Sequence, residues 1–301
     1  MRVRLCGLEL RNPIIAASGT FGYGIEFEDI LSLDRIGAFV TKGLSREPMP
    51  GNPAPRIIET ASGMMNAIGL QNVGVNPFIQ DKLPAIRRSG TLCIANVFGF
   101  VVEDYLAVIE ALNGAEGIVA YELNASCPNT RHGGLTFGAD PPQLAELVVR
   151  AKRLATRPII VKLSPNVTSI AQIARVSEAA GADAISLVNT FVSLAIDVKT
   201  RRPRIANVTG GLSGPAIKPI AVRMVWEASK AVKIPVIGMG GITTADDAVE
   251  FLLAGATAVQ VGTASYADPR AVERLAKSLT SWCRDNHVER VSDLTGGLKL
   301  Q

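Results

Sequence analysis

Eight short apolar runs, separated by segments with helical patterning, constrain the fold of this 301-residue chain more than any other feature. Each run has the length of a strand and leads into a helical pattern, as in repeated strand–helix units around a parallel sheet. Eight such units predict an α/β fold of the (β/α)8 (TIM) barrel type. The predicted strands span residues 13–18, 37–42, 92–97, 118–124, 158–164, 183–189, 235–240 and 258–263.

The remaining segments fit the same fold. Residues 3–10 alternate roughly as an edge strand, which we expect to close the bottom of the barrel. The long connections after the second, fourth and sixth strands are predicted to be binding loops or lids. A doubly wound open sheet is the alternative, but no glycine-rich dinucleotide fingerprint follows the first strand. No linker divides the chain, so we expect a single domain over residues 1–301.

Composition narrows the class of protein. Hydrophobic residues make up 48% of the chain, which predicts a large core, and the net charge of +4 without a basic stripe disfavours nucleic-acid binding. The four cysteines lie far apart with no CxxC pair, which argues against a zinc site, a metal cluster held by this chain or a disulfide scaffold. No signal peptide or bilayer-length apolar run is evident, so we expect a cytoplasmic protein.

Polar residues end six of the predicted strands. The carboxyl ends of barrel strands meet at one face, where catalytic residues project. One polar strand end can simply mark where a strand meets water, but six converging ends favour a site. They are Ser18, Lys42, Asn96, Asn124, Lys162 and Asn189.

The last two strands end differently, on Gly240-Gly241 and Gly262-Thr263. Glycines expose backbone N–H groups without a Cβ, and barrels commonly bind phosphate after strands seven and eight. This pattern predicts a phosphate cradle, with a tight packing turn as the alternative. Of the strand-end lysines, Lys162 suits either a Schiff base or a fixed positive charge against a reduced flavin, and the residues alone leave both roles open.

Cys127 is the strongest candidate for a catalytic residue. A thiol has a reference pKa of about 8.5, so it can accept a proton near neutral pH where serine cannot. Cys127 stands at the mouth of a glycine-rich loop, whereas Cys6, Cys93 and Cys283 are interpreted as small buried apolar residues. His132 is an alternative base, although a lone histidine in such a loop is more often solvated.

Amides are dense in residues 63–74, where Asn66, Gln71 and Asn72 offer donors and acceptors and Gly69 allows close backbone approach. With Asn124, Asn129 and Asn189, they predict a site for a polar heterocycle.

Motifs in chain order resemble those of the class 1 dihydroorotate dehydrogenases, over nearly the whole chain. They are "TKG", "NAIGLQN", "ELNASCPN", "VKLSPN", "VNT", "GGLSGPAIKP", "GMGGI" and "VGTA". "NAIGLQN" is most similar to the class 1B catalytic subunit. The resemblance implies FMN-dependent oxidation of (S)-dihydroorotate to orotate in UMP biosynthesis, with hydride passing from carbon six to the flavin.

The resemblance also implies residue roles. Cys127 would take the proton from carbon five of the substrate. FMN would be held by Ser18, Lys42, Gly43, Asn96, Asn124, Lys162, Val188, Gly214, Gly240, Gly241, Gly262 and Thr263. Dihydroorotate would be held by Lys42, Asn66, Ala67, Ile68, Gly69, Leu70, Asn124, Asn129, Asn189 and Thr190.

A partner is implied as well. Class 1B enzymes pass electrons to NAD⁺ through an iron–sulfur flavoprotein subunit, which would carry FAD and a [2Fe-2S] cluster. A homodimer of catalytic chains within a heterotetramer is then expected. The alternatives are a fumarate-linked class 1A enzyme, a Schiff-base barrel aldolase using Lys162, and a non-catalytic binder of a phosphate ligand.

Overall fold

The computed structural model describes residues 1–125 and 137–300. Eight parallel strands close a barrel in the order β10-β15-β16-β3-β4-β7-β8-β9. Every strand comes from one of the eight predicted runs, so the predicted barrel is confirmed. The strands are β3 (Ile14–Ala16), β4 (Ala38–Val40), β7 (Cys93–Val97), β8 (Ile118–Leu123), β9 (Ile159–Lys162), β10 (Ala184–Leu187), β15 (Val236–Met239) and β16 (Ala258–Val261).

Burial on both faces explains why these strands appear in the sequence as continuous apolar runs. All residues of β4, β7, β9, β10, β15 and β16 are buried, because helices cover the outside of the barrel and side chains fill the inside. The register is regular along most of the barrel; Ile185 of β10, for example, lies opposite Val161 of β9 and Val236 of β15.

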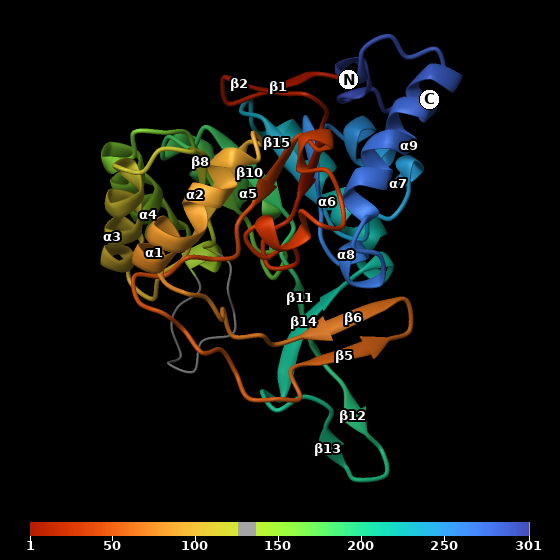
Figure 1. Ribbon diagram of the computed structural model, residues 1–301. Helices are drawn as coiled ribbons and strands as arrows, with labels where there is room; N and C mark the ends of the chain where they lie inside the picture. The colour runs from red at the N-terminus through yellow and green to blue at the C-terminus, as the bar shows by residue number, and fades with distance from the viewer. Residues whose placement is uncertain (126–136, 301) are drawn as a thin grey trace.

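Helices surround the barrel (Figure 1). Each longer helix turns an apolar stripe inward: α4 buries Leu144, Leu147, Val148 and Ala151, which recur at helical spacing. Among the described residues, no helix combines the length and apolarity needed to cross a bilayer. The α-helices are α1 (Val75–Pro77), α2 (Leu83–Arg88), α3 (Val102–Asn113), α4 (Pro141–Leu154), α5 (Ile170–Ala179), α6 (Lys218–Ala231), α7 (Ala245–Leu253), α8 (Ala264–Ala267) and α9 (Ala271–Asp285).

Short helical turns complete the connections. A π-helical turn, η3 (Phe78–Lys82), joins α1 to α2. The 3-10 turns are η1 (Ile25–Phe27), η2 (Leu33–Arg35), η4 (Phe137–Ala139), η5 (Pro215–Ile217) and η6 (Val291–Leu294).

The amino-terminal segment is a hairpin and not the predicted single edge strand. Strands β1 (Val3–Leu5) and β2 (Leu8–Leu10) pair antiparallel around Cys6 and Gly7, whose φ angles of 51° and 79° suit a two-residue turn. The Cys6 thiol donates to the carbonyl of Asp183, just before β10, at 3.5 Å. The hairpin therefore covers the amino-terminal end of the barrel, as predicted (Figure 1).

The connections after β4 and β10, predicted as long loops, contain strands that form a second sheet. The four antiparallel strands have the order β11-β14-β6-β5, and a smaller ribbon, β12 with β13, extends beyond them (Figure 1). Gly211 lies opposite Asn66, which joins the two connections to each other. The strands are β5 (Ile57–Thr60), β6 (Gly63–Asn66), β11 (Phe191–Leu194), β12 (Ile196–Asp197), β13 (Arg202–Pro203) and β14 (Thr209–Ser213).

Candidate active site

A cavity of about 540 Å³ lies between the carboxyl ends of the barrel strands and the second sheet. Side chains from both sides line it: Lys162 ends β9 of the barrel, whereas Met64 and Asn66 belong to β6. The cavity brings together most of the residues predicted from the sequence. They are Ser18, Lys42, Gly43, Asn66, Ile68, Gly69, Leu70, Asn124, Lys162, Val188, Asn189, Thr190, Gly214, Gly240, Gly241, Gly262 and Thr263.

The other predicted residues lie elsewhere. Asn96 is fully buried beneath the lining, where its Oδ1 lies 3.0 Å from the position of a Cβ added to Gly43. Ala67 is buried in a small apolar cluster with Met65 and Ile205, outside the lining. Cys127, Asn129 and the alternative base His132 lie outside the described residues.

A buried polar network under the cavity was missed by the sequence reasoning. The carboxylate of Glu122, on β8, accepts hydrogen bonds from Asn96 Nδ2 (2.8 Å), Ser186 Oγ (2.9 Å) and Gln260 Nε2 (2.6 Å). Its Oε1 also lies 3.8 Å from the Lys162 ammonium. The sequence did contain a signal for this network: Glu122 and Gln260 stand inside the apolar runs 118–124 and 258–263. Polar side chains buried in such runs need hydrogen-bond partners.

Lys42 supplies a second cation to the cavity. It follows β4, and its backbone N–H donates to Gly22 O at 2.8 Å. Burial lowers the pKa of the Lys42 ammonium, as does the nearby Arg56 guanidinium, while the Glu26 carboxylate opposes them. Lys42 and Lys162 make this region suited to an anionic ligand.

Amides gather at the ends of β8 and β10. Asn189 Nδ2 donates to Asn124 Oδ1 at 3.4 Å, and the backbone N–H of Thr190 donates to Asn189 Oδ1 at 2.8 Å. The Tyr105 hydroxyl donates to the backbone carbonyl of Asn124 at 2.9 Å. These contacts hold two cavity-lining amides side by side.

The amides of segment 63–74 have two different roles. Asn72 accepts from the N–H of Gly74 (2.8 Å) and donates to the carbonyl of Leu70 (2.8 Å), and Gln71 accepts from Arg56 (2.6 Å). Neither Gln71 nor Asn72 lines the cavity, whereas Asn66 does. Asn72 therefore shapes the loop, and the interpretation of Gln71 and Asn72 as site residues was wrong.

Glycines form a concave backbone surface at the ends of β14 and β15. Gly214, Gly240 and Gly241 have φ angles of 96°, 128° and 77°, a region that favours glycine. A Cβ at Gly241 would also lie 2.8 Å from the carbonyl oxygen of Gly214. Beside them, Thr263 Oγ1 donates to Ser213 Oγ at 2.8 Å. Backbone without a Cβ and these two hydroxyl-bearing residues therefore line the cavity together, an arrangement typical of a phosphate site.

Asp247 holds the turn that follows this cradle. Its Oδ2 accepts from the backbone N–H groups of Thr243 (2.9 Å) and Thr244 (2.8 Å), and Lys218 Nζ donates to Oδ1 at 2.6 Å. Burial opposes ionisation, but the hydrogen bonds from Lys218 and Thr243 outweigh it and hold the pKa of the Asp247 carboxyl well below its usual range. Thr243 also lines the cavity, so Asp247 connects α7 to the site.

The dihydroorotate dehydrogenase family model matches residues 1–282. The chain belongs to the dihydroorotate dehydrogenase family. The resemblance seen in the motifs is thereby confirmed, and the barrel and its cavity are those of a dihydroorotate dehydrogenase family member.

Relatives cover the whole length of this dihydroorotate dehydrogenase family chain. A Solibacter usitatus protein with the provisional name dihydroorotate dehydrogenase A (fumarate) is 58% identical over 98% of the chain and 97% of its own length. Two proteins named dihydroorotate dehydrogenase B (NAD(+)), catalytic subunit, are each 54% identical. That of Pelobacter propionicus matches 99% of this chain and that of Citrifermentans bemidjiense 100%, each over 98% of its own length.

Proposed function

We propose that this chain, as one domain over residues 1–301, oxidises (S)-dihydroorotate to orotate with FMN as its cofactor. The reaction belongs to pyrimidine biosynthesis and would take place in the cytoplasm. The observation that carries the proposal is one cavity, at the carboxyl ends of the barrel strands of this family member, which combines a glycine cradle, two lysines and a group of amides. The glycine cradle suits a phosphate, the lysines suit negatively charged ligand groups, and the amides suit a polar heterocycle.

The residues present fit FMN. The cradle of Gly214, Gly240 and Gly241 suits a phosphate, because a Cβ at Gly241 would close on the opposite backbone. Gln260 lines the cavity, and its fully buried Oε1 has no partner in the described part of the chain, which leaves an acceptor for a ligand N–H. The volume of about 540 Å³ lies within the usual range for cofactor sites.

Different residues of the cavity lining would contact different parts of FMN. Gly214, Gly240, Gly241, Gly262 and Thr263 would hold the phosphate. Lys162 would place a positive charge against the ring system, and FMN, when bound, supplies the acceptor for the hydride from carbon six of the substrate. The ring would be bordered by Ser18, Lys42, Gly43, Asn124 and Val188, with Asn96 acting from beneath.

Dihydroorotate would lie against the amides and Lys42. The ammonium of Lys42 pairs with the substrate carboxylate, and the Asn66, Asn124 and Asn189 amides each offer a donor and an acceptor to the ring. Asn129 and Thr190, with residues 67–70, complete the proposed substrate contacts. The thiolate of Cys127 takes the proton from carbon five, and it lies outside the described residues.

We further propose that electrons leave through an iron–sulfur flavoprotein partner, which carries FAD and a [2Fe-2S] cluster and reduces NAD⁺. The names of the Pelobacter propionicus and Citrifermentans bemidjiense relatives, both catalytic subunits of NAD(+) enzymes, support this proposal. A dimer of catalytic chains in a heterotetramer would then be the assembly. Fumarate is the second candidate acceptor, because the Solibacter usitatus relative carries that name.

Purified protein tests the function. We expect a yellow protein that releases one FMN per chain on denaturation, whose flavin absorbance is bleached by dihydroorotate without oxygen. Protein without FMN, or FMN that dihydroorotate does not reduce, would refute the proposal. Borohydride trapping with keto substrates serves as the control for the aldolase alternative, and it should leave Lys162 unmodified.

Acceptor assays test the second part. The chain alone should turn over poorly with NAD⁺, and co-expression with a flavin- and iron-bearing partner should raise that rate. Rapid turnover of the isolated chain with fumarate would instead favour the fumarate-linked enzyme.

A further inference from the structure

The interior of the barrel carries an ion pair where branched apolar side chains would normally stack. Glu122 is fully buried, and the Lys162 side chain is 8% exposed. The carboxylate is surrounded by groups from other strands: Asn96 on β7, Ser186 on β10 and Gln260 on β16. With β8 and β9, five of the eight barrel strands meet at this one carboxylate.

Stability alone does not account for this arrangement. A buried carboxylate loses its hydration, and replacing a buried ion pair by packed apolar residues is often neutral or stabilising. A role in ligand binding or catalysis therefore explains this polar layer beneath the cavity better than stability does. Lys162 and Gln260 both belong to the network and to the cavity lining, so the network reaches the site directly.

The geometry leaves Lys162 available to a ligand. Its Nζ lies 3.8 Å from Glu122 Oε1, an ion-pair distance that is too long for a hydrogen bond. The two carboxylate oxygens are instead occupied by the Asn96 and Gln260 amides and the Ser186 hydroxyl. The Glu122 carboxylate therefore attracts the Lys162 ammonium by charge without accepting a hydrogen bond from it.

We propose that Glu122 is a positioning residue of the active site. Its carboxylate sets the place of the Lys162 ammonium and of the Asn96 and Gln260 amides beneath the cofactor. Glu122 itself does not line the cavity, so it acts through these neighbours. The inference rests on the proposed function, in which Lys162 would face the flavin.

The test uses Glu122→Gln, Lys162→Met and the double variant. Glu122→Gln keeps the volume of the side chain, and a rotated Asn96 amide can accept from the new amide because its Oδ1 is unpartnered among the described residues. The midpoint potential of bound FMN and the FMN dissociation constant are measured for each protein. Both report on the charge at the flavin and not merely on folding.

We expect Lys162→Met to lower the midpoint potential in the wild-type background, because a positive charge near the reduced flavin is lost. In the Glu122→Gln background that shift should shrink by roughly half or more, since an unanchored ammonium contributes less. Glu122→Gln alone should weaken FMN binding about tenfold.

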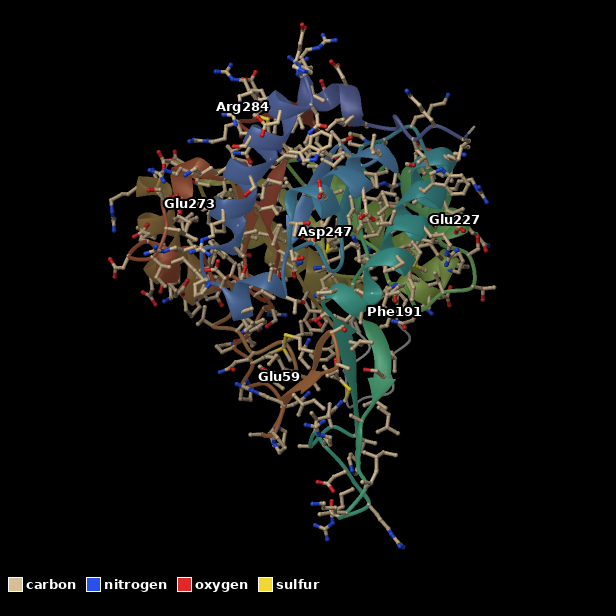
Figure 2. All side chains as sticks on the ribbon, turned by 90° about the vertical axis from the view of Figure 1, so that its right-hand side faces the viewer. Glu59, Phe191, Glu227, Asp247, Glu273 and Arg284 are labelled. Atoms are coloured by element: carbon tan, nitrogen blue, oxygen red, sulfur yellow. The ribbon has the colours of Figure 1, made fainter. Side chains whose placement is uncertain are left out.

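Glu59→Gln is the charge control. Glu59 lines the cavity from β5 but is exposed, and Figure 2 places it on the second sheet, away from the barrel. Removing that charge should leave the Lys162→Met shift at its full size. If Glu122→Gln does not fold, Ser186→Ala replaces it: this variant removes one donor to Glu122 without changing any charge, and should reduce the shift in the same sense.

An equal Lys162→Met shift with and without Glu122, or with and without Ser186, overturns the inference. Its failure is distinguishable from failure of the proposed function. Wild-type protein that binds no FMN refutes the function, whereas normal FMN binding and reduction without the coupling refute only the role of Glu122.

Discussion

At the scale of single residues, the three cysteines in the described part of the chain share one property. Burial raises the pKa of the Cys6 thiol to about 12, with the Asp183 carboxylate adding to the effect, and burial also raises the pKa values of Cys93 and Cys283. Thiols held protonated in this way are poor proton acceptors near neutral pH. Cys127 therefore remains the candidate base among the cysteines.

Cys127→Ala should lower dihydroorotate turnover by about 100-fold or more while FMN stays bound, because only the proton acceptor is removed. Cys127→Ser should be slow and should gain rate as the pH rises, since a serine hydroxyl is a weaker base at neutral pH. Steady-state rates from pH 6 to pH 10 and the FMN content measure both effects.

Cys283→Ala is the matched control, because Cys283 is buried in α9 and outside the cavity lining. It should keep wild-type turnover. Wild-type rates in Cys127→Ala across this pH range would show that the base is another residue.

At the scale of elements, the start of α7 couples helix capping to the cradle. Asp247 closes a capping box with Thr244, whose Oγ1 accepts from the Asp247 N–H at 3.2 Å. Figure 2 shows Asp247 among the helices beside the barrel, and Thr243, four residues before it, lines the cavity. The same carboxylate thus stabilises a helix and fixes a turn at the site.

The capping box predicts a pH dependence of stability. The pKa of Asp247 is lower in the folded protein than its ordinary value of 3.8, so its contribution is complete above about pH 5 and is lost as the pH falls below 3.8. Asp247→Asn should reduce the free energy of unfolding by about 1 kcal/mol at pH 7. It should also flatten the loss of stability in acid, which urea denaturation between pH 3 and pH 7 measures.

Asp246→Asn provides the control, because Asp246 is the exposed neighbour in the same helical turn. Asp246→Asn also removes one negative charge but leaves the capping contacts in place. Its free energy of unfolding at pH 7 should therefore fall less than that of Asp247→Asn. Equal losses in the two variants would contradict the role given to Asp247.

At the scale of the whole molecule, the second sheet and the ribbon that extends beyond it have different roles. Strands β5, β6 and β14 contribute to the cavity lining, whereas the β12–β13 ribbon is exposed throughout and contributes no residue to it. Near the base of the ribbon, Ile205 is buried against Met65 and Ala67. Shortening the ribbon should therefore leave the cavity intact, whereas losing the buried Ile205 side chain should disturb it.

Replacing residues 197–202 by Asn-Gly shortens the ribbon to a two-residue turn between Ile196 and Pro203, which are already paired. We expect the free energy of unfolding to change by less than about 0.5 kcal/mol and FMN affinity to be retained. In contrast, Ile205→Ala should cost about 2–4 kcal/mol and weaken FMN binding, since β6 loses its packing. Denaturation and flavin titration compare the two variants, and loss of FMN from the shortened protein would contradict this division.

The barrel could be predicted from the sequence because the signal for each barrel strand lies within the strand itself. A strand buried on both faces, such as β9, is an apolar run whatever its neighbours are. Parallel strands in a closed barrel also end at one face, so the sequence alone predicts that Lys42, Asn124 and Lys162 lie together. The presence of these strand-end residues in the cavity therefore follows from order along the chain, whereas Gly43, Val188 and Gly214 were predicted only from the family resemblance.

Only the tertiary structure decided features that depend on partners far away in the chain. Strands β6 and β14 pair across two separate connections, and each mixes buried residues with more exposed ones, so neither connection shows the pairing alone. Likewise, Asn66 lines the cavity and Asn72 does not, because the local hydrogen bonds of the loop use up the Asn72 amide. Glu122 is the clearest case: an acid within a strand has meaning only once four other strands supply its partners.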